Sequence, residues 1–271
     1  VADPNKDIPI EALGSGSDFS SFLQHLGVPA LDVGFSEEGQ TRGVYHSRYD
    51  TFEHHSRFAD PGFVYDALLA KTIGRMVLRV AESSVPVQRE TDFADAVSNY
   101  LSEVKKLADD KREEAETQAG LLRDHAFQLA SDPTKSSGLP TPLQPVPHIE
   151  FAVLEDAVDR LKHSAKAYDD TFAAHSSGLS GARLAHMQML MLDIGQTLAP
   201  DVGLPGRPWY KNLIYAPGLF TGYGAKTLPG VREAIEDQRW SDANRYAKLT
   251  ADALNTYSDR LDKATAVLNS R

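Results

Sequence analysis

The sequence predicts an α/β segment over about residues 1–86, followed by a mainly α-helical bundle over residues 87–271. Two observations lead to this fold class. Up to about residue 85, a helix-like stretch, a strand-like stretch and a second helix-like stretch follow one another, which is the rhythm of an α/β fold. From Thr91 onward the strand signal fades and apolar residues recur at helical spacing, which is typical of a helical bundle.

The composition indicates a globular protein and excludes several functional classes. With 271 residues, 41% hydrophobic and 24% charged, the chain can bury a core in one large or two ordinary domains. Its net charge of -10 argues against a nucleic-acid or anionic-membrane surface. No cysteine is present, so any zinc would be held by His, Asp and Glu. No apolar run is long enough to predict a membrane span, no signal peptide is expected, and the start at Val1 looks cut from something longer.

The first segment contains two predicted helices and one predicted strand. Ser17 or Asp18 can cap a helix whose apolar residues recur at i, i+3, i+4 and i+7, and Gly27 ends it: Phe19, Phe22, Leu23 and Leu26. The alternating residues of Ala30–Phe35 predict a strand. Residues 36–58 are polar and predict a loop, and the pair Asp60 and Pro61 predicts the start of a long helix that runs up to Pro86.

The second segment is predicted to hold four long helices. The first begins near Phe93 and runs into the charged stretch Asp109–Glu114, interpreted as a solvated helix face. Ser131–Pro147 is a connector rich in Ser, Pro and Gly. The remaining helices are marked by apolar residues over 151–172, 184–198 and 246–268, and the methionines of 184–198 are interpreted as core packing.

Residues 203–230 form an aromatic loop rich in Pro and Gly that is predicted to have no secondary structure of its own. One interpretation is a cap over the end of the bundle. The other is a site or an interface, because long irregular connections are uncommon otherwise and aromatic residues with Arg favour contact surfaces. The composition alone leaves the two interpretations equal.

The candidate chemistry lies in Val44–Thr51, where Tyr45 and His46 precede Asp50 and Thr51. An imidazole binds zinc well when neighbouring hydroxyl and carboxylate groups hold its ring in one tautomer and orientation. The alternative is that His46 is an ordinary surface or core histidine, as most histidines are.

Two sets of motifs carry a family resemblance. The first is Gly16-Ser17-Asp18, Phe22, Gly27-Val28-Pro29-Ala30 and His46-Ser47 before Asp50-Thr51, which resembles the C-terminal third of the co-catalytic zinc aminopeptidases and carboxypeptidases of family M28. The second is Arg207-Pro208, Ile214-Tyr215-Ala216-Pro217 and Leu228-Pro229-Gly230. It resembles the branch that contains glutamate carboxypeptidase II and the transferrin receptor, whose final domain is a helical dimerisation domain.

The resemblance implies a role for each matched residue. It implies that His46 is the last ligand of a two-zinc site with a bridging water nucleophile, and that Tyr45 hydrogen-bonds the tetrahedral intermediate. It implies that Ser15, Gly16 and Ser17 line the pocket for the residue before the scissile bond. It also implies that Tyr223 binds the C-terminal carboxylate of a peptide substrate. Residues 1–86 would then be the remnant of a zinc-peptidase domain, and residues 87–271 the dimerisation domain of a homodimer.

Departures from the family pattern limit these expectations. Asp32 and Gly34 stand where glutamate carboxypeptidase II has an arginine pair, and Gly222 stands where it has a lysine, so a preference for acidic substrates is not expected. The other zinc ligands and the general base fall upstream of the matched region, so this chain alone is expected to bind no zinc pair tightly and to be inactive. The alternative is a non-catalytic dimerisation module, although the transferrin receptor branch has lost the histidine present here as His46. The resemblance favours a periplasmic or extracellular location.

Overall fold

The computed structural model describes residues 10–35, 43–85, 88–132 and 138–270. The described residues form two compact units. The first unit takes in the chain up to Ala30 and from Arg89 onward, and the second is Leu31–Gln88.

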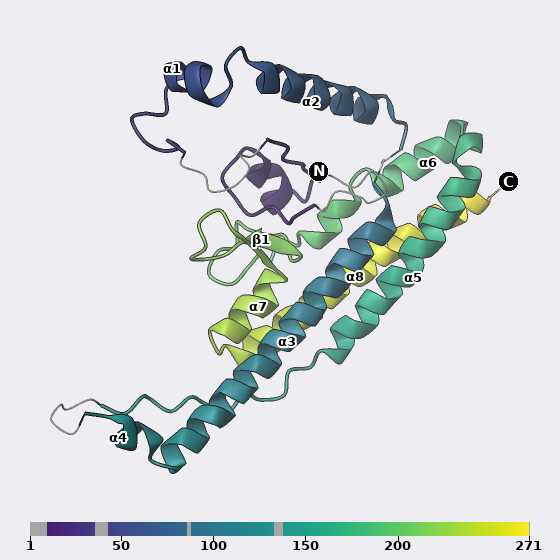
Figure 1. The fold of residues 1–271 in the computed structure, drawn as a ribbon. Helices are drawn as coiled ribbons and strands as arrows, with labels where there is room; N and C mark the ends of the chain where they lie inside the picture. The colour runs from purple at the N-terminus through teal and green to yellow at the C-terminus, as the bar shows by residue number, and fades with distance from the viewer. Residues whose placement is uncertain (1–9, 36–42, 86–87, 133–137, 271) are drawn as a thin grey trace. The chain divides into compact units, whose positions relative to one another are not determined.

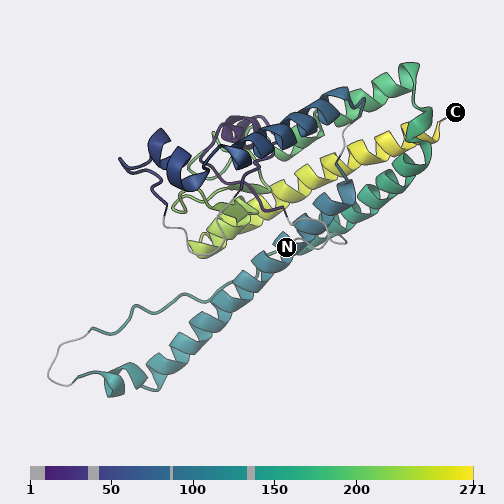
Figure 2. The same ribbon diagram turned by 45° about the horizontal axis from the view of Figure 1, so that its top comes forward.

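Three long helices, α3 (Glu90–Arg123), α5 (Ala152–His175) and α8 (Trp240–Asn269), run side by side in the first unit (Figures 1 and 2). Their apolar residues recur every three or four positions, so one face of each helix is buried. Leu154 and Leu161 of α5 and Leu254 and Leu261 of α8 are fully buried. Each such leucine contributes roughly 2 kcal/mol. The predicted helical bundle is therefore confirmed.

The region predicted as one helix over 184–198 contains two helices, α6 (Gly181–Met191) and the 3-10 helix η4 (Ile194–Leu198), which both pack on α8. A further 3-10 turn, η3 (Ser176–Gly178), follows α5. Met187 and Met191 are buried, which confirms the interpretation of core packing for these two, whereas Met189 is exposed.

The second half of α3 extends beyond the bundle and ends near the short helix α4 (Ala126–Ala130), as Figures 1 and 2 show. The described part of the connector returns along it, and the backbone N–H of Leu143 donates to Oε1 of Gln118 at 2.6 Å. The charged stretch Asp109–Glu114 lies on α3 with partly or fully exposed side chains, as the solvated-face interpretation predicts.

The aromatic loop contains secondary structure, so the prediction of an irregular connection was wrong. Strands β1 (Tyr215–Pro217) and β2 (Ala225–Thr227) pair antiparallel, with Tyr215 opposite Thr227. Helix α7 (Pro229–Glu236) follows and packs on α8. Pro229 is the first residue of α7, where its fixed φ angle suits a helix and its missing N–H costs nothing.

The N-terminal segment belongs to the first unit. The helix predicted after Ser17 is a short π-helical turn, η1 (Ser21–His25), in which Leu23 and Gln24 are buried. This segment lies against residues 195–225, which are distant in sequence.

The second unit is helical where the structure describes it, with α1 (Phe52–His54), the π-helical turn η2 (His55–Ala59) and α2 (Val64–Glu82). The strand predicted over Ala30–Phe35 was wrong. A strand needs a neighbour to pair its N–H and C=O groups, and none lies beside it among the described residues. The α/β character expected of residues 1–86 is therefore not seen in the described residues, where the sheet formed is β1–β2 of the first unit. Part of the predicted loop, residues 36–42, and the predicted helix end at Pro86 lie outside the described residues.

Candidate functional site

Residues Gly14–Gly16 contact Tyr223, which lies more than 200 positions further along the chain. The backbone N–H of Ser15 donates to the Tyr223 carbonyl at 3.2 Å, and the Ser15 hydroxyl donates to the Gly222 carbonyl at 3.2 Å. The structure therefore brings the segment predicted to line the pocket before the scissile bond into contact with the loop of the tyrosine predicted to bind the terminal carboxylate. Ser17 follows at the surface, and its carbonyl accepts from the Ser20 N–H at 3.1 Å.

The close contact depends on the absence of side chains at Gly14 and Gly16. A Cβ atom on Gly14 would lie 2.0 Å from the Tyr223 carbonyl oxygen. A Cβ atom on Gly16 would lie 2.7 Å from the Tyr223 ring, and Gly16 also has a φ angle of +114°, which L side chains rarely adopt. The two glycines thus form the surface on which Tyr223 rests.

Two buried amide side chains, Gln24 and Asn212, hold the segments on either side of the contact between Gly14–Gly16 and Tyr223. Gln24 donates from Nε2 to the carbonyls of Leu13 and Gly14, each at 3.1 Å, while its main-chain carbonyl accepts from the Lys211 N–H at 2.7 Å. Asn212 donates to the Leu23 carbonyl at 3.3 Å and accepts from the Ile214 N–H at 2.9 Å. Sequence reasoning missed both residues.

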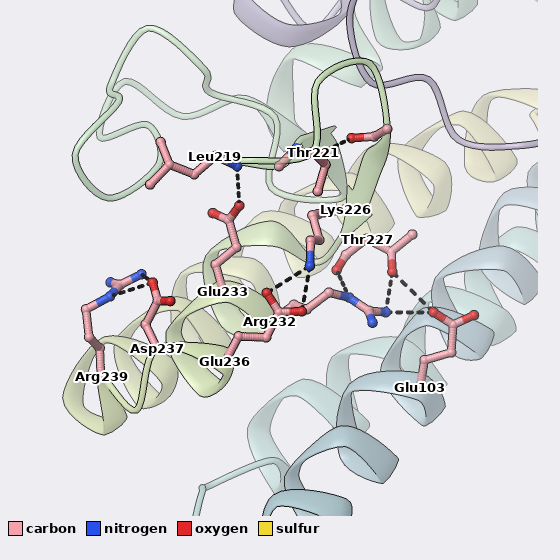
Figure 3. Close-up of polar contacts among 12 residues, drawn as sticks. Glu103, Leu219, Thr221, Lys226, Thr227, Arg232, Glu233, Glu236, Asp237 and Arg239 are labelled. Carbon is pink, nitrogen blue, oxygen red and sulfur yellow. Dashed lines mark hydrogen bonds and ion pairs between the residues drawn. The ribbon is translucent and has the colours of Figure 1, made fainter.

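We define Gly218–Gly224, which connects β1 to β2, as the tyrosine loop. The Thr221 side chain links the two ends of the loop, because its hydroxyl oxygen accepts from the Gly218 N–H at 2.9 Å and donates to the Gly224 carbonyl at 2.6 Å. The Leu219 N–H donates to Oε1 of Glu233 on α7 at 2.8 Å, as Figure 3 shows. The loop that carries Tyr223 is therefore held by its own atoms and by α7.

Tyr45 and His46 lie in the second unit, whereas Ser15, Gly16, Ser17 and Tyr223 lie in the first. The rings of Tyr45 and His46 are stacked with centroids 3.9 Å apart, and His46 has a φ angle of 61°. The turn is closed by Ser47, whose hydroxyl donates to the Val44 carbonyl at 2.6 Å. Tyr45 is 66% exposed, so its hydroxyl-bearing ring lies at the surface of the unit.

The two zinc ions expected of the intact parent need more ligands than the described residues gather around His46. The described residues place three ligand-type side chains together at one location, His55, Asp60 and Asp66, and this group does not include His46. Its members already serve the start of α2: Asp60 accepts from the N–H groups of Val64 and Asp66, and His55 contacts Asp66 at 2.8 Å. A single imidazole cannot hold two zinc ions.

The pKa of Asp60 lies below its ordinary value. Burial favours the neutral acid, but the N–H groups of residues 64–66 and the nearby His55 together stabilise the carboxylate more strongly. Asp60 is therefore a charged cap of α2.

Among the described residues, no helix is both long and apolar enough to cross a membrane.

Comparison with known proteins supports the family resemblance. Residues 149–262 match the transferrin receptor-like dimerisation domain. The chain is 29% identical over 227 residues to a probable glutamate carboxypeptidase, LAMP1, of Arabidopsis thaliana, covering 83% of this chain and 27% of that protein. It is 26% identical over 248 residues to a probable glutamate carboxypeptidase of Arthroderma benhamiae, covering 90% and 29%. It is 22% identical over 269 residues to the aminopeptidase NAALADL1 of Rattus norvegicus, covering 93% and 31%.

The chain thus spans less than a third of the length of these relatives. The dimerisation-domain match covers α5, α6, the β1–β2 hairpin, α7 and most of α8, so it takes in two of the three long helices and the hairpin but not α3. The resemblance predicted from the sequence is confirmed: residues 149–262 match the transferrin receptor-like dimerisation domain, and the chain is similar to proteins named as probable glutamate carboxypeptidases and as an aminopeptidase.

Proposed function

We propose that this chain is part of a zinc-dependent exopeptidase that hydrolyses peptide bonds of small peptides. The observation that carries the proposal is the contact of Ser15 and Gly16 with the tyrosine loop. The family resemblance gives Ser15 and Gly16 a place in the pocket for the residue before the scissile bond and makes Tyr223 the ligand of the terminal carboxylate, and in the first unit these residues are in contact. The relatives named as glutamate carboxypeptidases and as an aminopeptidase support the same class of reaction.

In this proposal the residues of the chain bind and orient the substrate. Tyr223 binds the terminal carboxylate, and Ser15, Gly16 and Ser17 line the pocket for the residue before the scissile bond. Tyr45 donates a hydrogen bond to the oxyanion that develops on the peptide carbonyl. His46 is one metal ligand, so a zinc pair requires further ligands from the rest of the parent protein. The chain by itself is then inactive and holds no zinc pair tightly.

The proposal is tested by substitutions in the intact parent protein. Tyr45→Phe removes one oxyanion donor and should lower the turnover number on a dipeptide by roughly 10²-fold or more. His46→Ala should abolish most activity and reduce the zinc content measured after dialysis. The neighbouring Tyr49→Phe is a matched control, since Tyr49 is also exposed and the resemblance gives it no role. Unchanged turnover in Tyr45→Phe and His46→Ala would show that the proposed roles are incorrect.

A second candidate function is a dimerisation module without catalysis. The specific observation that favours it is the match of residues 149–262 to a dimerisation domain. The two functions are distinguished in the intact protein, because a module of this kind forms a dimer but shows no turnover on a panel of dipeptides.

A further inference from the structure

A buried ion pair lies beside the tyrosine loop. Arg207 and Glu233 are each only 10% exposed in their side chains, and Nη2 of Arg207 lies 2.7 Å from Oε2 of Glu233. The guanidinium also stands 5.3 Å from the centre of the Tyr210 ring. Removing two charges from water is costly, so a buried pair of this kind contributes little net stability by itself. What the pair contacts is therefore more informative than its strength.

Both members of the pair hold the main chain at the start of the tyrosine loop. Nη1 of Arg207 donates to the carbonyl of Pro217, the last residue of β1. The Leu219 N–H donates to Oε1 of Glu233 at 2.8 Å (Figure 3). The pair therefore fixes the backbone on both sides of Gly218. Charged partners make these hydrogen bonds stronger than neutral ones.

The rest of the loop transmits this constraint to Tyr223. Gly218 donates to the Gly224 carbonyl at 3.2 Å, and Gly224 donates to the Thr221 carbonyl at 3.1 Å. The ring of Tyr223 then meets Gly16. Tyr223 is thus positioned from one side by the N-terminal segment and from the other by the ion pair.

We propose that Arg207 and Glu233 are positioning residues that hold Tyr223 where it binds the terminal carboxylate of the substrate. This inference rests on the proposed peptidase function. Neither charge is directed at the substrate, because the two side chains pair with each other and each forms a hydrogen bond with the main chain at the start of the tyrosine loop. Loss of the pair should therefore weaken substrate binding more than it slows the chemical step.

The chain offers a matched control in a second ion pair, whose acidic member also lies on α7. Lys226 of β2 lies 2.6 Å from Oε1 of Glu236 on α7. Its side chains are 24% and 31% exposed, so it is also partly buried. The hydrogen bonds described for Glu236 go to Lys226 and not to the tyrosine loop (Figure 3). Glu236→Gln therefore removes a charge from α7 without releasing the loop.

The test compares steady-state kinetics of full-length variants on a dipeptide. Glu233→Gln keeps the size of the side chain but removes the charge that Arg207 pairs with, and Arg207→Lys cannot reach Glu233 and Pro217 together. Each should raise KM about 10-fold with kcat within about twofold, the scale of one charge-assisted hydrogen bond. Glu236→Gln should leave both constants unchanged.

A double variant isolates the route of the effect. If Glu233 acts through Tyr223, the KM of Tyr223→Phe with Glu233→Gln should match that of Tyr223→Phe alone. Additive effects on KM, or a loss confined to kcat, would overturn the positioning role. Thermal unfolding of each variant identifies any that fail to fold. If Glu233→Gln does not fold, the KM of Arg207→Lys decides whether the ion pair has a positioning role.

Amide hydrogen exchange tests the positioning role without measuring turnover, so its result does not depend on the proposed peptidase function. Amide hydrogen exchange at Leu219 and Gly224 should accelerate about 10-fold in Glu233→Gln but not in Glu236→Gln. Unchanged exchange in Glu233→Gln would overturn the positioning role even in an active enzyme. A wild-type parent that cleaves no dipeptide would instead overturn the peptidase function, and the exchange rates would still decide whether the pair holds the loop.

Discussion

Gly14 is the residue at which the contact with the tyrosine loop leaves no space for a side chain. A Cβ atom there would meet the Tyr223 carbonyl at 2.0 Å and the Ala225 nitrogen at 2.9 Å, and both are backbone atoms. Backbone cannot rotate away as the end of a side chain can. We expect Gly14→Ala to lower the free energy of unfolding by about 1 to 3 kcal/mol, measured by urea denaturation.

Gly120 provides the control for this prediction. It lies inside α3, and a Cβ atom there meets only Nη2 of Arg123, at 3.9 Å. Because alanine favours a helix more than glycine does, Gly120→Ala should stabilise the unit by about 0.5 to 1 kcal/mol. If both variants shifted stability equally, the close contact at Gly14 would not be the cause.

Asp60 should make the start of α2 sensitive to acid. Its pKa is lowered in the folded state from an unfolded value of about 4. The stabilisation is therefore complete above about pH 4 and is lost as the pH falls through the lowered pKa. NMR shifts of Val64–Ala67 should report loss of helix in this lower range. Asp60→Asn keeps an acceptor but no charge and should abolish the pH dependence, so a transition that persists in this variant would point to another group.

The site residues differ in how far the sequence could identify them. Ser15, Gly16, Ser17 and Tyr223 follow from the motifs of the family, and the structure brings Ser15 and Gly16 to Tyr223. Gln24 and Asn212 do not follow from any motif, since their partners are main-chain groups of distant segments. The available signal was weak: Gln24 stands between Leu23 and Leu26 in a stretch whose apolar residues recur at helical spacing.

At the scale of secondary structure elements, the long helices were predictable and the short elements were not. Helices α3, α5 and α8 repeat their apolar residues over many turns, so the pattern alone identifies them. The alternating pattern of Ala30–Phe35 was misleading, because a strand depends on a partner that the local sequence does not reveal. Strands β1 and β2 have three residues each and show no periodicity. The start of α7 could have been found from Pro229.

Helix α3 begins at a cap supplied by another helix. Asp169 of α5 accepts from the N–H groups of Glu90 and Thr91 at 3.1 and 2.9 Å and from the Thr91 hydroxyl at 2.7 Å. A carboxylate at a helix N-terminus satisfies unpaired N–H groups and interacts favourably with the helix dipole. Asp169→Ala should therefore lower the free energy of unfolding by about 1 to 2 kcal/mol in urea denaturation.

The adjacent residue Asp170 is the control for Asp169. Its carboxylate pairs with Lys166 at the surface, where both side chains are well exposed. Such pairs contribute roughly 0.5 kcal/mol or less, so Asp170→Ala should change stability little. Equal losses in the two variants would mean that the cap contributes no more than surface charge. Next to the cap, burial raises the pKa of Tyr257 well above its ordinary value. The charge of Glu90, whose carboxylate accepts a hydrogen bond from the Tyr257 hydroxyl, acts in the same direction.

At the scale of the whole molecule, the match to a dimerisation domain predicts a two-fold dimer. Sedimentation equilibrium at micromolar concentration should report about twice the chain mass of 29.7 kDa. An obligate interface should bury more than about 2,000 Å². A monomer at this concentration would show that the helical domain alone is not enough to form the dimer.

The surface of α6 offers a way to locate this interface. Met189 of α6 and Leu192, the residue that follows its last turn, are 74% and 82% exposed and lie close together in sequence. Leu192→Glu should shift the equilibrium toward the monomer if this face is part of the interface. The equally exposed Leu129 of α4 provides a control, and Leu129→Glu should leave the mass unchanged.

The bond between Ser15 and Gly222 joins residues 207 positions apart, and this separation has a consequence during protein synthesis. At roughly 5 to 20 residues per second, the ribosome needs about 10 to 40 seconds to make the chain between them. Throughout this interval the turn that contains Leu23 and Gln24 lacks residues 209–212, which bind it in the folded protein. Translation that stops before Asn212 leaves this turn uncovered, and such nascent chains are the ones that chaperones should retain.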